Sequence, residues 1–241
     1  MVPLSLIEQL EEFETPVIAE SLAAMEHPRK YDDYMSDDIK LLTPMPRPLV
    51  GVALTLEVDT STLGHHSDLD GYLKRLDQMR AMKVPAVLVM KTVGQRPRHE
   101  CIMGDGMAKQ FMSAGCRGVI GDGAARDLPG IARAGLTLFA TGLTCDHGSL
   151  CYRIPKGPVT VGGVTVRDGD LLHADGNGVR LIPADTHHAI VEACCQTRDF
   201  ETRAHLINRQ SELSIDEGRK LALALAAIRA EKCKAAYARK P

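Results

Sequence analysis

The sequence predicts an α/β fold with a C-terminal helical extension. Between residues 50 and 140, short apolar strands alternate with helical segments, which is the pattern of an α/β layer. After Gly142 the pattern changes, because residues 158–182 alternate apolar and polar side chains around glycine-containing turns, as antiparallel hairpins do. We therefore expect one α/β domain over residues 1–209 and a helical extension over residues 210–241.

The first part of the chain predicts two helices and a long connection. Residues 4–13 have helical spacing, and a second helix runs through Met25 with Thr15 as its N-cap and Pro16 in its first turn. Residues 27–47 are polar and Pro-rich, which favours a connection over the surface.

The α/β layer then follows in order. We expect strands at residues 50–58, 85–90, 118–120 and 136–140, helices at 69–82, 107–114 and 128–134, and polar loops at 59–68 and 92–103. Gly115 suits the position after a helix end. Residues 184–209 return to helical spacing. Ser214 and Glu217 form a capping box before a last helix with Leu221, Leu225 and Ile228 on one face.

Composition limits the possible functions. The chain has 241 residues, a net charge of −2 and no apolar run of about 20 residues, so we expect neither nucleic-acid binding nor a membrane span. The first residues lack the basic and apolar regions of a secretory signal. Seven cysteines without a C-x-x-C motif favour a reducing cytoplasm, with Cys116, Cys194 and Cys195 as small core residues.

Two glycine-rich turns carry the chemistry. Gly104-Asp105-Gly106-Met107 opens a helix, whose first N–H groups suit a carboxylate or enolate oxygen, and Asp105 beside an anion indicates an intervening cation. In the second turn, Arg126 matches a carboxylate with two hydrogen bonds, and Asp127 is a hard oxygen ligand for Mg²⁺ or Mn²⁺. The structural alternative is that Asp105 and Asp127 are only N-caps.

Several segments in order resemble the RraA-like family, which includes 4-hydroxy-4-methyl-2-oxoglutarate/4-carboxy-4-hydroxy-2-oxoadipate aldolases and the regulator of ribonuclease E activity. The resemblance covers roughly residues 10–205. It rests on the Thr15-Pro16 helix, the strand from Val50, Gly104-Asp105 with its helix, the run from Gly118 to Arg126-Asp127, and the run from Gly169 to Pro183.

The resemblance implies an α-β-β-α sandwich with a central mixed sheet, assembled as a homotrimer or homohexamer. It also implies a metal-dependent aldolase that uses Mg²⁺ or Mn²⁺. By carry-over, Arg126 holds the pyruvyl part of the substrate, Asp127 binds the metal and Asp105 holds metal-bound water. Amides of Gly104, Gly106 and Met107 bind the substrate carboxylate. Glu201, eighteen residues after Pro183, enters the neighbouring subunit's site.

We therefore expect a cytoplasmic lyase that cleaves a 4-hydroxy-2-oxo acid to pyruvate by retro-aldol chemistry. The resemblance also implies oxaloacetate decarboxylase activity. Two alternatives stay open: a metal-dependent decarboxylase, dehydratase or hydrolase of another small hydroxy or oxo acid, and a non-catalytic regulator that binds a ribonuclease. Asp127 favours the enzyme, because the regulator branch carries a neutral residue there.

Three further features lie outside the resemblance. The loop with His65 and His66, and the Arg98-His99-Glu100 segment, could add a ligand or alter specificity, or could simply be solvated. His147 follows Cys145 closely, but sequence neighbours rarely form a Cys–His nucleophile pair, so we do not expect one.

Overall fold

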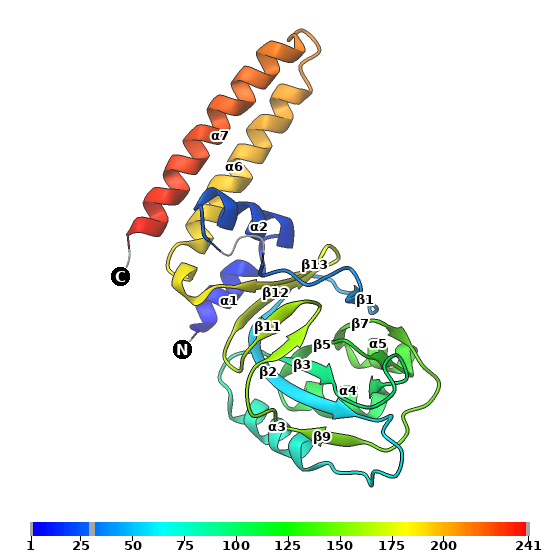
Figure 1. Cartoon of the computed structure of the whole chain (residues 1–241). Coiled ribbons are helices and arrows are strands. Elements are labelled where there is room, and N and C mark those ends of the chain that lie inside the picture. Colours follow the sequence, from blue (N-terminus) through cyan, green and yellow to red (C-terminus); the bar gives the residue numbers. More distant parts are fainter. Residues whose placement is uncertain (1, 29–31, 240–241) are drawn as a thin grey trace. The chain divides into compact units, whose positions relative to one another are not determined.

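A computed structural model describes residues 2–28 and 32–239, and its chain forms two compact units (Figure 1). The first unit comprises the residues up to Glu12 together with Asp33–Ile182. The second comprises Phe13–Asp32 and the residues from Pro183 onward. The glycine turns both lie in the first unit.

The first unit is built around an eight-stranded mixed sheet, as the sequence and the resemblance predict. Strands β7, β5, β3 and β2 run parallel in this spatial order. Antiparallel strands extend both edges: β1 pairs with β7, while β12 pairs with β2 and then with β13. Strand β9 pairs with the end of β2. The bounds are β1 Lys40–Leu41, β2 Leu49–Asp59, β3 Ala86–Thr92, β5 Cys116–Gly121, β7 Thr137–Ala140, β9 Cys151–Arg153, β12 Leu171–Asp175 and β13 Gly178–Ile182.

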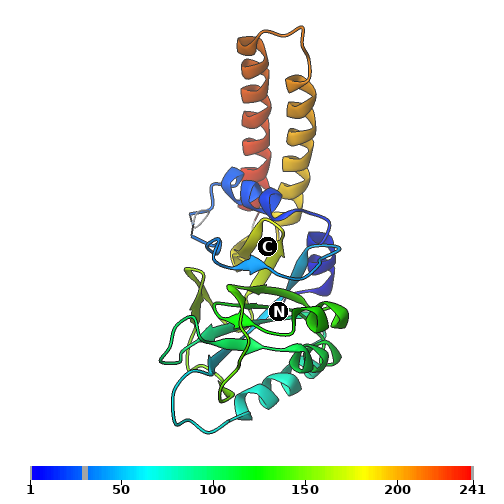
Figure 2. The ribbon, with the colours of Figure 1, turned by 90° about the vertical axis from the view of Figure 1, so that its right-hand side faces the viewer.

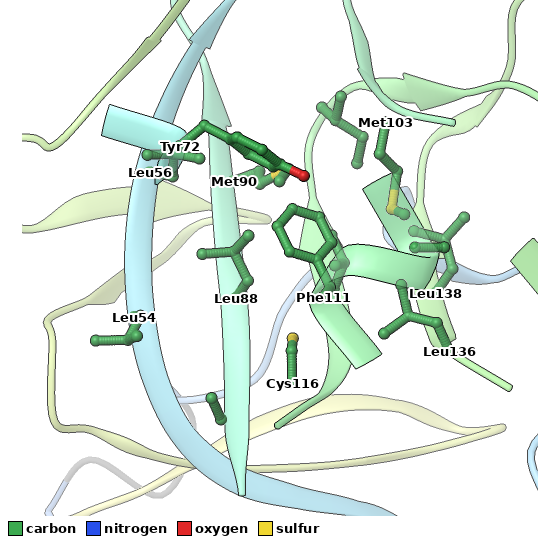
Figure 3. Close-up of a cluster of buried hydrophobic side chains, with 14 of the residues drawn as sticks. Leu54, Leu56, Tyr72, Leu88, Met90, Met103, Phe111, Cys116, Leu136 and Leu138 are labelled. Carbon is green, nitrogen blue, oxygen red and sulfur yellow. The ribbon is translucent and has the colours of Figure 1, made fainter. Parts of the chain in front are cut away.

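Helices α3 (Asp70–Ala81), α4 (Asp105–Ser113) and α5 (Leu128–Ala134) pack on one face of this sheet. Strand β3 shows why the sequence folds this way. Its alternate residues Leu88 and Met90 join the cluster under the helices, with Phe111 of α4 (Figure 3). A fully buried side chain of this size contributes roughly 1.5–3 kcal/mol to the free energy of unfolding.

The other face of the sheet is covered by a second, smaller β layer. Val87 and Val89, the alternate residues of β3, pack there with the valines of the hairpin β10 (Val159–Val161) and β11 (Val164–Val166). Gly162 has φ +55° and Gly163 has φ +81°, so this hairpin turns through the glycines as predicted. Helix α1 (Leu4–Leu10) also belongs to this unit, where His173 on β12 contacts the Leu10 carbonyl at 3.2 Å.

The second unit is helical, which confirms the predicted C-terminal helical region. Helix α2 (Thr15–Ala24) packs against α6 (Ile190–Asn208), and α6 lies antiparallel beside α7 (Ile215–Ala238) (Figure 2). Ser214 and Glu217 form the predicted capping box of α7. The predicted domain limit at residue 209 falls in the α6–α7 connection and stays a prediction. Among the described helices, none combines the length and apolar character needed to cross a membrane.

Several local expectations need correction. Glu14, not Thr15, is the N-cap of α2, and it makes no side-chain capping hydrogen bond. The predicted helix 184–209 starts with a separate 3₁₀ turn, Ala184–Thr186, before α6. Cys195 is exposed, because it lies on the outer face of α6, whereas Cys116 and Cys194 are buried as expected. Three short strands that the sequence does not reveal form a small parallel sheet: β4 Cys101–Met103, β6 Ala124–Ala125 and β8 Gly142–Leu143.

Candidate active site

The small parallel sheet brings the two glycine turns together. Strand β4 ends at the Gly104 turn, β6 ends at Arg126, and the Arg126 N–H donates to the Met103 carbonyl at 3.1 Å. Because parallel neighbours end at the same edge, helices α4 and α5 start side by side. Between them lies a pocket of about 190 Å³. Its lining residues are Cys101, Met103, Gly104, Asp105, Gly106, Met107, Arg126, Asp127, His147, Leu150 and Tyr152. Six of the seven predicted site residues are therefore in one place.

Asp127 has an unusual backbone conformation. Its φ is +59° and its ψ is +35°, a left-handed conformation that few residues other than Gly, Asn and Asp adopt. It occupies the N-cap position of α5, but its side chain makes no capping hydrogen bond. The structural alternative is therefore confirmed for the N-cap position, while the capping hydrogen bond of the side chain is absent. The side chain is 49% exposed instead.

Arg126 and Asp127 form an ion pair in the pocket. Arg126 Nε lies 3.3 Å from Asp127 Oδ2, and both side chains are partly exposed. A pair of this kind contributes at most about 1 kcal/mol, so a ligand can separate it at small cost. Gly104 makes room for both groups, because a Cβ at this position would lie 3.0 Å from Asp127 Oδ2 and 3.4 Å from Arg126 Nε.

Asp105 is the first residue of α4, and Gly104 rather than Asp105 occupies the N-cap position. The Asp105 carboxylate pairs with Lys109 Nζ at 2.7 Å, one helical turn on. This hydrogen bond, with that of the Gly106 N–H, lowers the pKa of Asp105, so the group is ionised. Its Cβ lies against Gly130 of α5, where an added Cβ would come within 2.5 Å. The two helix starts are thus in direct contact.

The inner wall of the pocket consists of buried side chains, among them Cys101, Met103 and Tyr152. The Tyr152 hydroxyl donates to Met107 Sδ at 3.3 Å, and burial raises the pKa of this tyrosine. Burial also raises the pKa of the Cys101 thiol, which donates to the Met103 carbonyl. A buried, neutral thiol is a poor nucleophile. The reactive groups of the pocket are therefore its carboxylates, its arginine and its histidine.

The pocket contains two carboxylates that suit a hard cation. In the described ranges 2–28 and 32–239, no group of three or more His, Cys, Asp and Glu side chains is arranged as a metal site. Mg²⁺ commonly binds through one or two carboxylates and keeps several waters. The exposed Asp127 carboxylate, with Asp105 in the same pocket, fits a water-rich site of that kind.

The remaining predicted residues lie elsewhere. Glu201 is on α6 in the second unit, and its expected place in a neighbouring subunit's site stays a prediction. Burial, together with the charges of Glu20 and Glu14, raises its pKa. His65 contacts Asp59 at 3.1 Å, and neither His65 nor His66 lines the pocket.

Two acidic residues of the conspicuous sequence runs have structural roles. Asp122 accepts hydrogen bonds from the Thr92 N–H at 2.7 Å and from its hydroxyl at 3.0 Å, which fixes the end of β3. Glu100 is buried and accepts from the Thr60 N–H at 2.7 Å and from the Ser61 hydroxyl at 2.5 Å. This glutamate anchors the loop that follows β2.

His147 is the pocket residue that the sequence reasoning did not assign. We considered it only as a partner of Cys145, two residues earlier, and Cys145 does not line the pocket. The loop between β8 and β9 brings His147 into the pocket that Arg126 and Asp127 line, and these two residues follow a different strand. The spacing of residues along the sequence could not reveal that His147 lies in this pocket, because only the fold brings these segments together.

Comparison with known proteins agrees with this fold. Residues 8–180 match the model of the RraA-like family, described as Aldolase/RraA. The chain belongs to the RraA-like family. This family includes both aldolases and ribonuclease E inhibitors. The matched range contains both glycine turns and ends before α6.

The individual proteins that match share 22–31% sequence identity with the chain. This RraA-like chain is 31% identical over 126 residues to Protein DlpA of Legionella pneumophila, a match that covers 50% of this chain and 20% of that protein. Two solved structures share the fold at 22% identity. One is Streptomyces coelicolor RraAS2, described as an unusual member of the RNase ES inhibitor RraA family (TM-score 0.70, 86% of this chain, 99% of that one). The other is an uncharacterized protein from Pseudomonas syringae pv. tomato (TM-score 0.69, 91% of this chain, 95% of that one).

Proposed function

We propose that this RraA-like chain is a divalent-metal-dependent lyase that cleaves a 4-hydroxy-2-oxo acid to pyruvate by retro-aldol chemistry. Decarboxylation of oxaloacetate is the associated activity, because both reactions pass through the enolate of pyruvate. The observation that supports the proposal best is the exposed Asp127 carboxylate, which makes no capping hydrogen bond and shares a pocket with Arg126 and the first residues of α4.

The roles follow from the chemistry of each group. Asp127 would bind Mg²⁺ or Mn²⁺, and Asp105 would hold a water on that ion. The bound cation would supply Lewis-acid stabilisation of negative charge on the oxo-acid oxygens. Arg126 offers a planar guanidinium to the substrate carboxylate, once its ion pair with Asp127 opens. The first N–H groups of α4 provide further donors, because a helix leaves them without intrahelical acceptors.

The direct test measures pyruvate release from 4-hydroxy-2-oxo acids and from oxaloacetate with Mg²⁺ or Mn²⁺. We expect EDTA to abolish pyruvate release and the added metal to restore it. Asp127→Asn should reduce turnover by at least about 100-fold, because the amide is a poor ligand for a hard cation. Full pyruvate release by this variant would refute the proposal.

Asparagine is the informative replacement at this position. It tolerates the left-handed backbone as aspartate does, whereas alanine would add about 1–2 kcal/mol of backbone strain. Asp127→Asn should therefore unfold at the same urea concentration as the wild type, and Asp127→Ala at a lower one. A matched control is Asp77→Asn, which changes an exposed aspartate of α3 outside the pocket lining.

Two alternatives remain as outcomes of the same screen. Turnover of another small hydroxy or oxo acid with the same metal and Asp127 dependence would indicate a decarboxylase, dehydratase or hydrolase. The Arg126–Asp127 ion pair is the observation that favours a non-catalytic regulator, because it would keep both side chains engaged without a substrate. That candidate predicts tight binding to a ribonuclease and no metal-dependent turnover of any oxo acid.

A further inference from the structure

His147 lines the Arg126–Asp127 pocket and is the one histidine among its described lining residues. The proposed function gives no role to His147 or to its loop between β8 and β9. An imidazole at this place is chemically significant, because retro-aldol cleavage needs a group that accepts the proton of the substrate hydroxyl. A role for His147 in this proton transfer rests on the proposed function.

One hydrogen bond of the imidazole ring determines its tautomer. His147 Nδ1 lies 2.7 Å from the Gly148 carbonyl oxygen, and a carbonyl oxygen can only accept. Nδ1 therefore carries the proton in the neutral ring, which leaves Nε2 with a lone pair. Nε2 can then accept a hydrogen bond from a hydroxyl group of a ligand in the pocket.

The loop around His147 is held in place from several sides. Asp146 Oδ1 accepts the N–H of His147 at 2.7 Å, and the Thr144 N–H donates to the Ala125 carbonyl at 2.9 Å. Gly148 has φ +50°, and a Cβ there would lie 2.1 Å from the Thr60 carbonyl oxygen. The buried Glu100 holds Thr60 in turn. A group held in this way keeps its orientation without the substrate.

The other ionisable groups of the pocket are already engaged. Asp105 pairs with Lys109, Asp127 pairs with Arg126 and would bind the metal, and the Cys101 and Tyr152 side chains are buried and neutral. Arg126 cannot act as a base, because a guanidinium stays protonated in proteins. Among the described lining residues, the imidazole is thus the side chain that keeps a nitrogen lone pair available in its neutral form.

We propose that His147 Nε2 accepts the proton of the substrate's C4 hydroxyl during carbon–carbon cleavage. The O–H electron pair forms the new C4 carbonyl, the C3–C4 bond breaks, and its electron pair passes to the pyruvate enolate. The imidazolium then returns the proton to C3, which gives pyruvate. No electrons are gained or lost overall, and no further reactant is needed. The chemical class of the substrate is accordingly a tertiary or secondary 4-hydroxy-2-oxo acid.

His147→Gln is the decisive variant, because glutamine keeps a polar side chain but accepts no proton at neutral pH. The two activities make different demands on His147, since oxaloacetate loses CO₂ without a hydroxyl proton to transfer and its enolate can take the C3 proton from water. We expect kcat for hydroxy-acid cleavage to fall by about 100-fold or more, and oxaloacetate decarboxylation to stay within a factor of about 3. His65→Gln, outside the pocket, is the matched control and should leave both rates unchanged.

The outcomes separate this proposal from the proposed function. An equal loss of both activities would assign His147 a structural role, and undiminished hydroxy-acid cleavage would assign the proton to another acceptor, such as a water near Arg126. Either result overturns the His147 proposal alone. No pyruvate from any substrate with the wild type would overturn the proposed function instead.

A second measurement tests His147 without turnover. In the metal-free protein labelled with ¹⁵N-histidine, the imidazole signals that disappear in His147→Gln report its tautomer. We expect protonation at Nδ1 and a shift of the Nε2 signal when a hydroxylated analogue, 4-hydroxy-2-oxoglutarate, is added. A proton on Nε2 in the neutral ring, or an Nε2 signal unaffected at saturating analogue, would contradict the proposal whatever the activity.

Discussion

At residue 127 the proposed chemistry depends on the left-handed conformation of the backbone. A left-handed backbone directs the Asp127 side chain into the pocket instead of back onto the α5 amides. Strained conformations of this kind persist where the surrounding structure holds them, often at functional sites. The sequence indicated that Asp127 is chemically important. It could not indicate the sign of φ, because aspartate at a helix start usually adopts an extended backbone and caps the helix.

Glu201 gives a second residue-scale prediction. Burial raises its pKa first, Glu20 and Glu14 raise it further, and His205 and Arg229 oppose the shift. A carboxyl group whose pKa is raised in the folded protein lowers the free energy of unfolding once it ionises. Its cost is absent below the ordinary value of 4.5, develops as the pH rises from there to the raised value, and is complete above it.

We therefore expect Glu201→Gln to increase the free energy of unfolding at pH 7 by up to about 0.5 kcal/mol, since the site is partly exposed and screened. The advantage should disappear at pH 4. Urea unfolding at the two pH values measures it, with Glu212→Gln in the exposed α6–α7 connection as the control. A wild type more stable than Glu201→Gln at pH 7 would contradict this prediction.

At the scale of elements, the sequence predicted the long strands, the hairpins and the capped helices well. Strands β2 and β3 carry enough alternating or continuous apolar residues to be recognised alone. Strands β4, β6 and β8 have two or three residues each, too few for any periodicity. They exist because distant segments pair with one another. The pairing of β4 with β6 is nevertheless what joins the two glycine turns into one pocket.

The contact between α4 and α5 leads to a matched pair of substitutions. Gly130 in the first turn of α5 faces Asp105, and an alanine Cβ would come within 2.5 Å of Asp105 Cβ. We expect Gly130→Ala to lower the free energy of unfolding by about 1–3 kcal/mol through overpacking. Gly106 in the first turn of α4 has nothing within 4 Å of an added Cβ. Gly106→Ala should therefore raise the free energy of unfolding by about 0.5–1 kcal/mol.

Urea unfolding of both variants measures this difference. The two changes are chemically identical and occupy equivalent turns of short helices, so helix propensity alone predicts the same sign for both. If Gly130→Ala proved as stable as Gly106→Ala, the close packing of α5 on Asp105 would be refuted.

At the scale of the whole molecule, the question is whether one chain makes a complete site. The pocket residues all belong to the first unit, whereas Glu201 belongs to the second. The family resemblance implies that this glutamate serves a neighbouring subunit. In that case Asp127→Asn and Glu201→Gln would each inactivate a homo-oligomer, but by damaging opposite sides of the same shared site.

Mixed oligomers test this arrangement. When the two inactive variants are unfolded together and refolded at equal amounts, half of the sites keep Asp127, and half of those receive an intact Glu201 from a neighbour. We expect about one quarter of the wild-type rate of pyruvate release, for a trimer or a hexamer alike. Simple mixing without refolding should restore little activity if subunits exchange slowly. If refolded mixtures stay inactive while each variant alone assembles normally, Glu201 acts within its own chain or not at all.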